Sequence, residues 1–75
     1  MIQYEYLCYE RPPMPGAVPS DGLVKVKTPP DGVDSIIIRG VTYNCWGYVF
    51  YDRALSDTEL SDYALKFLAT HRTLR

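Results

Sequence analysis

The stretch Ser56-Asp-Thr-Glu-Leu-Ser-Asp-Tyr-Ala-Leu-Lys-Phe-Leu68 carries the strongest local structural signal in the chain. It opens with a capping box, in which the Ser56 hydroxyl accepts from the amide of Glu59 and the Glu59 carboxylate accepts from the amide of Ser56. Apolar residues then recur at helical spacing and form one stripe, which comprises Leu60, Tyr63, Ala64, Phe67 and Leu68. We therefore expect a helix over residues 57–69 that packs on a sheet, followed by a frayed basic tail over residues 70–75.

The segments before this helix predict strands. Residues 2–9 alternate between two faces, one of which carries Ile2, Tyr4, Tyr6 and Cys8. Residues 23–27 predict a short strand whose lysines suit a sheet edge, where charge discourages unwanted pairing.

A hairpin is expected further along the chain. Residues 34–38 resume as a strand, and Arg39-Gly40 fits a two-residue turn. Residues 41–51 are compatible with one long strand that is kinked at Gly47, or with two strands that are hinged at residues 44–47. The sequence pattern does not decide between one strand and two.

These elements predict an α+β fold with a small, mainly antiparallel sheet of three to five strands and one C-terminal α-helix packed on one face. The chain has 75 residues, a length that fits a single domain over residues 1–75. The expected core comprises Ile2, Tyr4, Tyr6, Val24, Val26, Ile36, Ile38, Val49, Leu60, Tyr63, Ala64, Phe67 and Leu68.

Residues 10–22 form a proline-rich loop that contains four of the six prolines. Proline lacks the N–H that a sheet ladder needs and holds the preceding residue extended, so this loop is stiff. Pro12-Pro-Met-Pro15 matches the P-x-x-P spacing that polyproline-binding domains recognise. The interpretation we favour is a rigid loop that packs Met14 and Val18 over the sheet.

Net charge and the number of cysteines indicate which classes of protein the chain can belong to. Eight Lys and Arg stand against nine Asp and Glu, a formal net charge of −1, whereas nucleic-acid-binding domains usually carry a basic excess. We expect no signal peptide, and no apolar run is long enough to span a membrane. Cys8 and Cys45 are expected to be reduced, which fits a protein of the bacterial cytoplasm.

The residues that could carry out chemistry are few. His71 is the one histidine and is expected in the tail, without a partner carboxylate. Cys8 and Cys45 lie in apolar strand-like stretches, where a thiol acts as a small hydrophobe. No metal-ligand spacing and no glycine-rich phosphate loop is present. We therefore expect a protein that is not an enzyme and that needs no cofactor and no metal.

Asp52-Arg53 lies between the last predicted strand and the capping box. It fits either a charged recognition pair or, as we favour, a local tie that fixes the strand-to-helix corner.

Aromatic residues exceed what one small core can bury, so some are expected at the surface. Exposed Tyr and Trp are preferred anchors in protein interfaces because they contribute a large contact area at low entropic cost. The residues we expect to bind a partner are Tyr9, Arg11, Met14, Trp46, Tyr48, Asp57 and Asp62.

Two resemblances involve the C-terminal part of the chain. Residues 48–63 are similar to the closing strand and short helix of laminin-G-type domains, but those sandwiches need about twice this length. The same region resembles small accessory proteins of phages and conjugative elements of Gram-positive bacteria. These end in a Tyr-x-Arg-x-Leu-(Ser/Thr)-x-x-Glu-x-x-x-Tyr pattern, which is matched here by Tyr51, Arg53, Leu55, Ser56, Glu59 and Tyr63.

The second resemblance implies a mobile-element protein that binds and inhibits a host defence protein by covering its surface, as anti-CRISPR and anti-restriction proteins do. The alternative is a nucleic-acid-associated protein in which Lys25, Lys27, Arg39, Arg72 and Arg75 meet phosphates. A further alternative is a structural module that forms homodimers through an edge strand.

Overall fold

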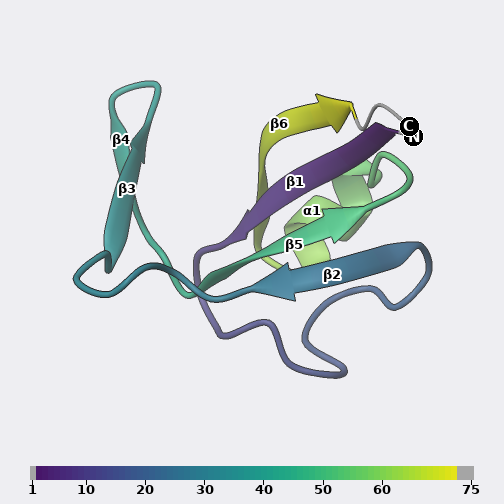
Figure 1. Ribbon diagram of the computed structural model, residues 1–75, viewed down its shortest axis with the longest axis horizontal. Helices are drawn as coiled ribbons and strands as arrows, with labels where there is room; N and C mark the ends of the chain where they lie inside the picture. Colours follow the sequence, from purple (N-terminus) through teal and green to yellow (C-terminus); the bar gives the residue numbers. More distant parts are fainter. Residues whose placement is uncertain (1, 73–75) are drawn as a thin grey trace.

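The computed structural model describes residues 2–72. In chain order, its elements are β1 (Ile2–Cys8), β2 (Leu23–Lys27), β3 (Ser35–Ile38), β4 (Val41–Asn44), β5 (Gly47–Tyr51), α1 (Asp57–Asp62) and β6 (Leu65–Arg72). One sheet has the strand order β2-β5-β1-β6, and β3 and β4 form a separate two-stranded sheet that stands beside it (Figure 1). The pairings between these strands are antiparallel, which confirms the predicted α+β fold.

One face of the four-stranded sheet, which we call the core face, is covered by other segments of the chain. Val18 from the proline-rich loop and Leu55 from the segment before α1 pack on this face. The buried sheet residues that they contact as one cluster are Tyr6, Cys8, Val49, Tyr51 and Leu65. Leu60 and Tyr63 pack against this cluster. The loop and the helical segment therefore form the second layer of the domain.

Two buried hydrogen bonds fasten this cover to the sheet. The Tyr51 hydroxyl donates to the carbonyl of Pro19 over 2.6 Å, and the Tyr6 hydroxyl accepts from the amide of Leu55 over 2.9 Å. The two tyrosine rings meet edge to face, with centroids 5.9 Å apart. Each phenol thus buries its ring and satisfies a backbone group that would otherwise be buried without a partner.

The opposite face of the sheet, which we call the open face, carries charged side chains around a few buried ones. The strand registers place Glu5 opposite Phe50 and place Leu7 opposite Tyr48. Leu7 and Phe50 are buried although they lie outside the cluster on the core face. The lysines of β2 also lie on the open face, because Lys25 pairs with Phe50 and Lys27 with Tyr48.

The hairpin formed by β3 and β4 confirms the predicted turn. Arg39 and Gly40 both have positive φ angles, of 50° and 80°, as a two-residue turn of matching twist requires. At the base of the hairpin, the Cys45 amide donates to the Asp34 carbonyl over 2.9 Å and the Trp46 amide donates to the Cys8 carbonyl over 3.0 Å. Residues 41–51 are therefore two strands that are hinged between Asn44 and Gly47.

The helix is shorter than the apolar stripe predicts. The capping box is present, but α1 ends at Asp62, and Ala64 has a positive φ of 53° that directs the chain out of the helix. Leu65 and Phe67 then alternate with Lys66 along β6, which pairs with β1. Hydrogen bonding to the central strand outweighs local helix propensity here. Residues 70–72 belong to β6 rather than to a tail, and residues 73–75 lie outside the described part of the chain.

Part of the predicted core is wrong. Tyr6, Val49 and Ala64 are buried, but four residues of the predicted core are at least 40% exposed, namely Ile2, Val24, Val26 and Phe67. Ile2 lies at the end of β1 and Val24 and Val26 lie on the edge strand β2, so fewer neighbours cover them. Buried residues that were not expected in the core are Leu7, Phe50, Tyr51, Leu55 and Leu65. Cys8 and Cys45 are buried as small hydrophobes, as expected, and Val18 packs against the sheet.

Arg53 ties the corner between β5 and α1, as the favoured interpretation of Asp52-Arg53 predicts. Its guanidinium binds both carboxylate oxygens of Glu59, over 2.9 and 2.7 Å, and its Nε donates to the carbonyl of Asp21 over 3.0 Å. The hydrogen bonds from Arg53, assisted by the amide of Ser56, lower the pKa of Glu59 from 4.5 to about 2. One side chain therefore joins the proline-rich loop, the corner and the helix N-terminus.

The Glu59 interaction predicts a pH-dependent contribution to stability. Because the folded-state pKa is lowered, the contribution is complete above the unfolded value of 4.5 and is lost as the pH falls through about 2. Glu59→Gln should therefore unfold more easily than the wild type at pH 7, and the difference should shrink between pH 4.5 and pH 2. Urea unfolding at several pH values measures it, with Asp62→Asn as the control for loss of one carboxylate. An equal difference at both ends of this range would contradict the assignment.

No helix within residues 2–72 is long and apolar enough to cross a membrane.

Candidate functional site

The proline-rich loop and the edge strand β2 enclose an apolar pocket, which we call the loop pocket. It has a volume of about 270 Å³ and is lined by Pro13, Met14, Pro15, Gly16, Val18, Ser20, Leu23 and Val26. Met14 is 59% exposed and Val26 is 45% exposed, so the mouth of the pocket presents apolar surface to solvent. Two half-exposed apolar side chains beside an apolar cavity are typical of a binding surface.

The position of the loop pocket depends on a close contact at the start of β5. A Cβ atom on Gly47 would lie 2.8 Å from the Pro13 ring and 3.2 Å from the carbonyl oxygen of Lys27. Only glycine lets the loop lie this close to the sheet. This contact holds Pro13 against the end of β2, and it brings Met14 and Trp46, the chain neighbours of Pro13 and Gly47, to the same part of the molecule.

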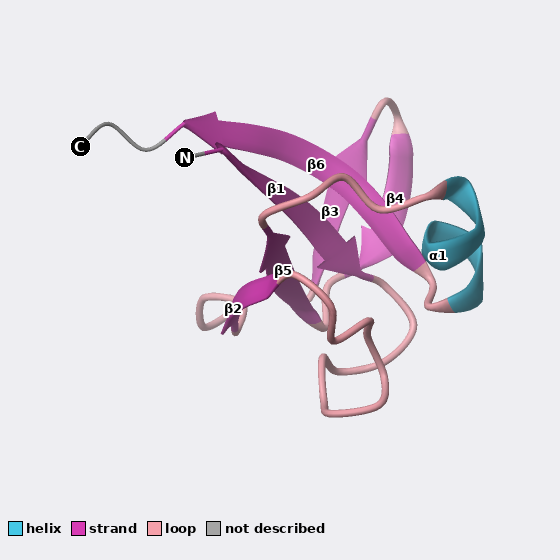
Figure 2. Cartoon of the chain, turned by 90° about the vertical axis from the view of Figure 1, so that its right-hand side faces the viewer, coloured by secondary structure: helices cyan, strands magenta, loops and turns pink. Residues whose placement is uncertain are grey.

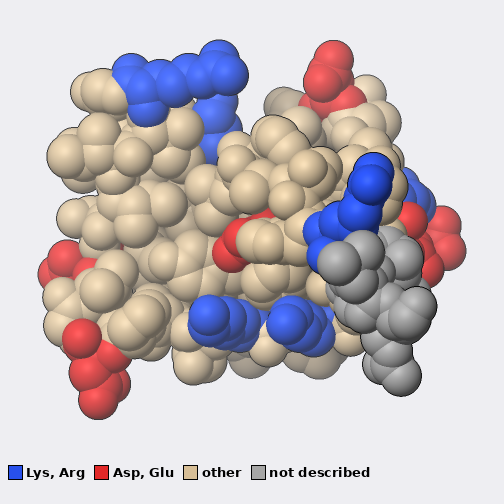
Figure 3. All heavy atoms as spheres, turned by 45° about the horizontal axis from the view of Figure 1, so that its top comes forward, with Lys and Arg blue, Asp and Glu red and all other residues tan. Residues whose placement is uncertain are grey.

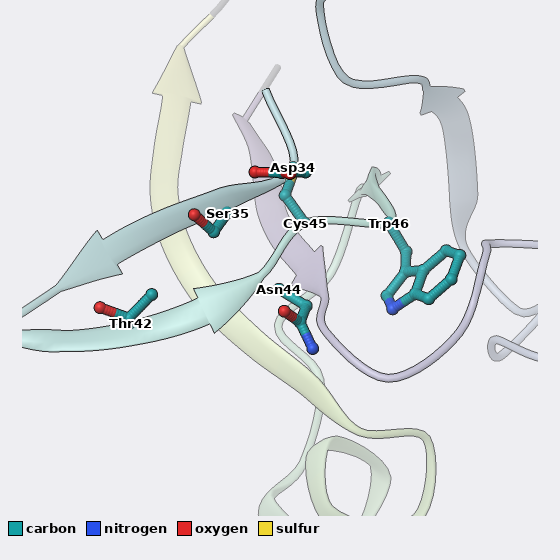
Figure 4. A pocket seen from close by; sticks show the side chains of 6 residues that line it. All are labelled: Asp34, Ser35, Thr42, Asn44, Cys45 and Trp46. Atoms are coloured by element: carbon teal, nitrogen blue, oxygen red, sulfur yellow. The ribbon is translucent and has the colours of Figure 1, made fainter. Parts of the chain in front are cut away.

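A second hollow, which we call the hairpin pocket, lies at the base of the hairpin. Its volume is about 510 Å³, and its lining is Asp34, Ser35, Thr42, Asn44, Cys45 and Trp46. Figure 4 shows the Trp46 indole turned away from the hairpin and from the hydroxyls of Ser35 and Thr42. The polar groups of this larger hollow therefore do not converge on one point, and the loop pocket is the better candidate.

The open face carries positive charge at its margins. Figure 3 shows Lys and Arg side chains around this side of the molecule, with an acidic side chain between them. The Lys25 ammonium lies 4.6 Å from the centroid of the Phe50 ring, and the Lys66 ammonium lies 5.9 Å from that of Tyr43. Lys25 and Lys27 lie on the edge strand β2, on the face opposite to the loop pocket.

The environment of His71 corrects the sequence-based expectation. His71 lies in β6, and its Nε2 atom is 2.6 Å from Oε1 of Glu5. Its ring also lies 5.7 Å from that of Phe50. The pairing of β6 with β1 brings the carboxylate to the histidine, a contact that spans most of the chain and leaves no local signal.

The two cysteines are buried and unbridged, as expected. Burial raises the pKa of the Cys8 thiol to about 11, and the neighbouring Cys45 adds to the rise. A thiol with this pKa stays protonated near pH 7, which does not favour a nucleophile. The neighbouring Cys45 and, after it, burial raise the pKa of Tyr48 to about 12.

The predicted partner-binding residues are distributed over several regions. Met14 lines the loop pocket and Trp46 the hairpin pocket. Tyr9 is half-buried against Tyr43 beside the hairpin, and Tyr48 is half-buried on the open face. Arg11 is exposed and lies 3.9 Å from Glu10.

The remaining two, Asp57 and Asp62, are exposed on α1. In Figure 2 this helix and β2 lie on opposite sides of the molecule. The seven residues therefore do not form one surface.

The β2 side of the loop pocket was not predicted from the sequence. Val26 and Leu23 line it, but the alternation of residues 23–27 places Val26 in the core. One signal for this surface was present, since the lysines already marked β2 as an edge strand.

The comparisons with known proteins support a family assignment. The family model described as Defence against restriction A C-terminal matches residues 1–70. The chain belongs to this family. No curated protein and no solved structure matches the chain.

Membership of the Defence against restriction A C-terminal family supports the predicted resemblance to accessory proteins of the anti-restriction type. The family's name is compatible with an anti-restriction role. The match extends over the proline-rich loop, β2 and the hairpin, so both pockets lie within the part of the chain that defines the family.

Proposed function

We propose that this chain is an anti-restriction protein that binds a host restriction protein and covers part of its surface, without catalysing a reaction. The family assignment supports the anti-restriction role. The proposed mode of action is supported by the surface features, because an apolar pocket beside an exposed strand edge is suited to a protein partner.

The observation that carries the proposal is the position of Met14. This side chain is 59% exposed and lines an apolar pocket that the Pro13–Gly47 contact holds in place. A large apolar side chain that is exposed at the rim of a pocket gains burial when a partner covers it, and little backbone entropy is lost because the loop that carries it is already held in place.

The test compares Met14→Asp with Ile37→Asp in bacteria that carry a restriction system and receive unmodified plasmid DNA. Ile37 is 72% exposed on the hairpin and does not line the loop pocket, so it is a matched apolar-to-acidic control. The wild type and Ile37→Asp should raise the yield of transformants. Met14→Asp should lower that gain by about tenfold. An equal loss in both variants, or no loss in either, would argue against this surface.

A nucleic-acid-binding alternative is supported by the two lysines of β2, which lie on one face beside Phe50. It predicts binding to plain DNA that weakens steeply as salt increases. Binding of a restriction subunit that persists at high salt would favour the protein partner.

A further inference from the structure

The outer edge of β2 is free to accept another strand. β2 ends the strand order β2-β5-β1-β6 and pairs with β5 alone. Within residues 2–72, the hydrogen bonds outside the strand ladders involve no backbone group of residues 24–27. Unpaired N–H and C=O groups along such an edge are a template for strand addition.

The two sides of this edge differ in chemistry. Lys25 and Lys27 project to the open face, whereas Val26 projects to the core face and lines the loop pocket. Directly opposite residues in neighbouring strands share a face. A strand added at this edge would therefore meet a lysine, the loop pocket and a second lysine at three successive positions.

This alternation disfavours a second copy of the chain as the occupant. Two copies of β2 joined edge to edge would bring lysines of both copies together on the open face, where like charges are destabilising. Acidic side chains at these positions would instead pair with the lysines.

Resting on the proposed function, we propose that β2 binds an extended segment of the restriction protein with an acidic–apolar–acidic pattern. The two carboxylates pair with Lys25 and Lys27, and the apolar side chain between them enters the loop pocket beside Met14. Backbone hydrogen bonds to the edge of β2 supply affinity, while the pocket and the lysines select the sequence. The lysines thus discourage pairing with neutral strands and admit an acidic one.

The experiment titrates the ¹⁵N-labelled protein with a capped peptide of sequence Ser-Thr-Glu-Leu-Glu-Thr-Ser. We expect amide shifts in residues 23–27 and 13–18. Three control peptides should bind at least about tenfold more weakly: one with Lys in place of both Glu, one with Ser in place of Leu, and one with N-methylated backbone amides. Equal binding of all four peptides, or binding of none, overturns the proposal.

A charge swap tests the two lysines directly. The double variant Lys25→Glu/Lys27→Glu should bind the acidic peptide about tenfold more weakly than the wild type does and should bind the lysine peptide more tightly. Lys66→Glu is the matched control, because Lys66 also lies over an aromatic ring but on β6. Unchanged peptide preference in the double variant would contradict the assignment.

Comparison with the transformation assay separates the two proposals. If the double variant still relieves restriction, the proposed function is retained and the proposal that β2 binds an acidic segment is refuted. Binding of the acidic peptide by a protein that relieves no restriction refutes the proposed function and retains the strand-addition site.

Discussion

Replacing Leu7 with alanine is expected to lower the free energy of unfolding by about 2–5 kcal/mol, because a buried leucine that is truncated leaves a cavity. Leu7 is 0% exposed and lies on the central strand β1, between Tyr48 of β5 and Lys66 of β6. Domains of this size are stabilised by only about 5 kcal/mol or somewhat more. Urea unfolding at 25 °C should therefore show a much lower midpoint for Leu7→Ala, with no more than about 3 kcal/mol of stability left if the wild type has about 5 kcal/mol.

Val24→Ala is the control for this prediction. Val24 is 40% exposed on the edge strand, so the loss should be below about 1 kcal/mol. Simple alternation along the strands predicts the opposite order, since it puts Val24 in the core and Leu7 on the outer face. A larger loss for Val24→Ala than for Leu7→Ala would show that Leu7 is not buried as described.

Local signals accounted for the strands, the hairpin turn and the helix start. Arg39-Gly40 and the Ser56–Glu59 capping box are each defined by residues within a few positions of one another, and both are present. Strand alternation along residues 2–9 placed Tyr6 and Cys8 correctly on the core face.

The predictions were wrong where contacts between segments far apart in the sequence determine secondary structure or burial. Residues 65–68 fit either a helical stripe or a strand, and pairing with β1 selects the strand. Leu7 is buried beside Tyr48 of β5 and Lys66 of β6, neighbours that the alternation of residues 2–9 does not reveal. The Glu5–His71 pair likewise depends on the pairing of the first strand with the last.

In the candidate site, too, local features could be predicted from the sequence and contacts between distant segments could not. Met14 was expected to bind a partner, but the favoured interpretation of the proline-rich loop also packed Met14 over the sheet, and that packing is wrong: Val18 is buried there, whereas Met14 is 59% exposed. The loop pocket could not be predicted, because it exists only where that loop lies against β2 and Gly47. The Pro13–Gly47 contact joins positions far apart in the sequence, so no spacing rule indicates it.

Gly47→Ala is expected to lower the free energy of unfolding by about 1–3 kcal/mol, because the new methyl group overpacks a closed site. Its Cβ would lie 2.8 Å from the Pro13 ring and 3.2 Å from the Lys27 carbonyl oxygen. Gly47 does not have a positive φ, so the cost is steric rather than torsional. Urea unfolding measures the loss, and the peptide titration should show weaker binding because Pro13 forms a wall of the loop pocket.

Two further variants separate these causes. Gly32→Ala meets no atom within 4 Å but has a φ of +84°, so it should cost about 1–2 kcal/mol through backbone strain and leave peptide binding unchanged. Pro13→Ala removes the ring atoms that the new methyl would strike. Adding Pro13→Ala to Gly47→Ala should therefore cost less than the sum of the two single losses. Strictly additive losses would mean that Pro13 and Gly47 are not in contact, and the loop pocket would lose its physical basis.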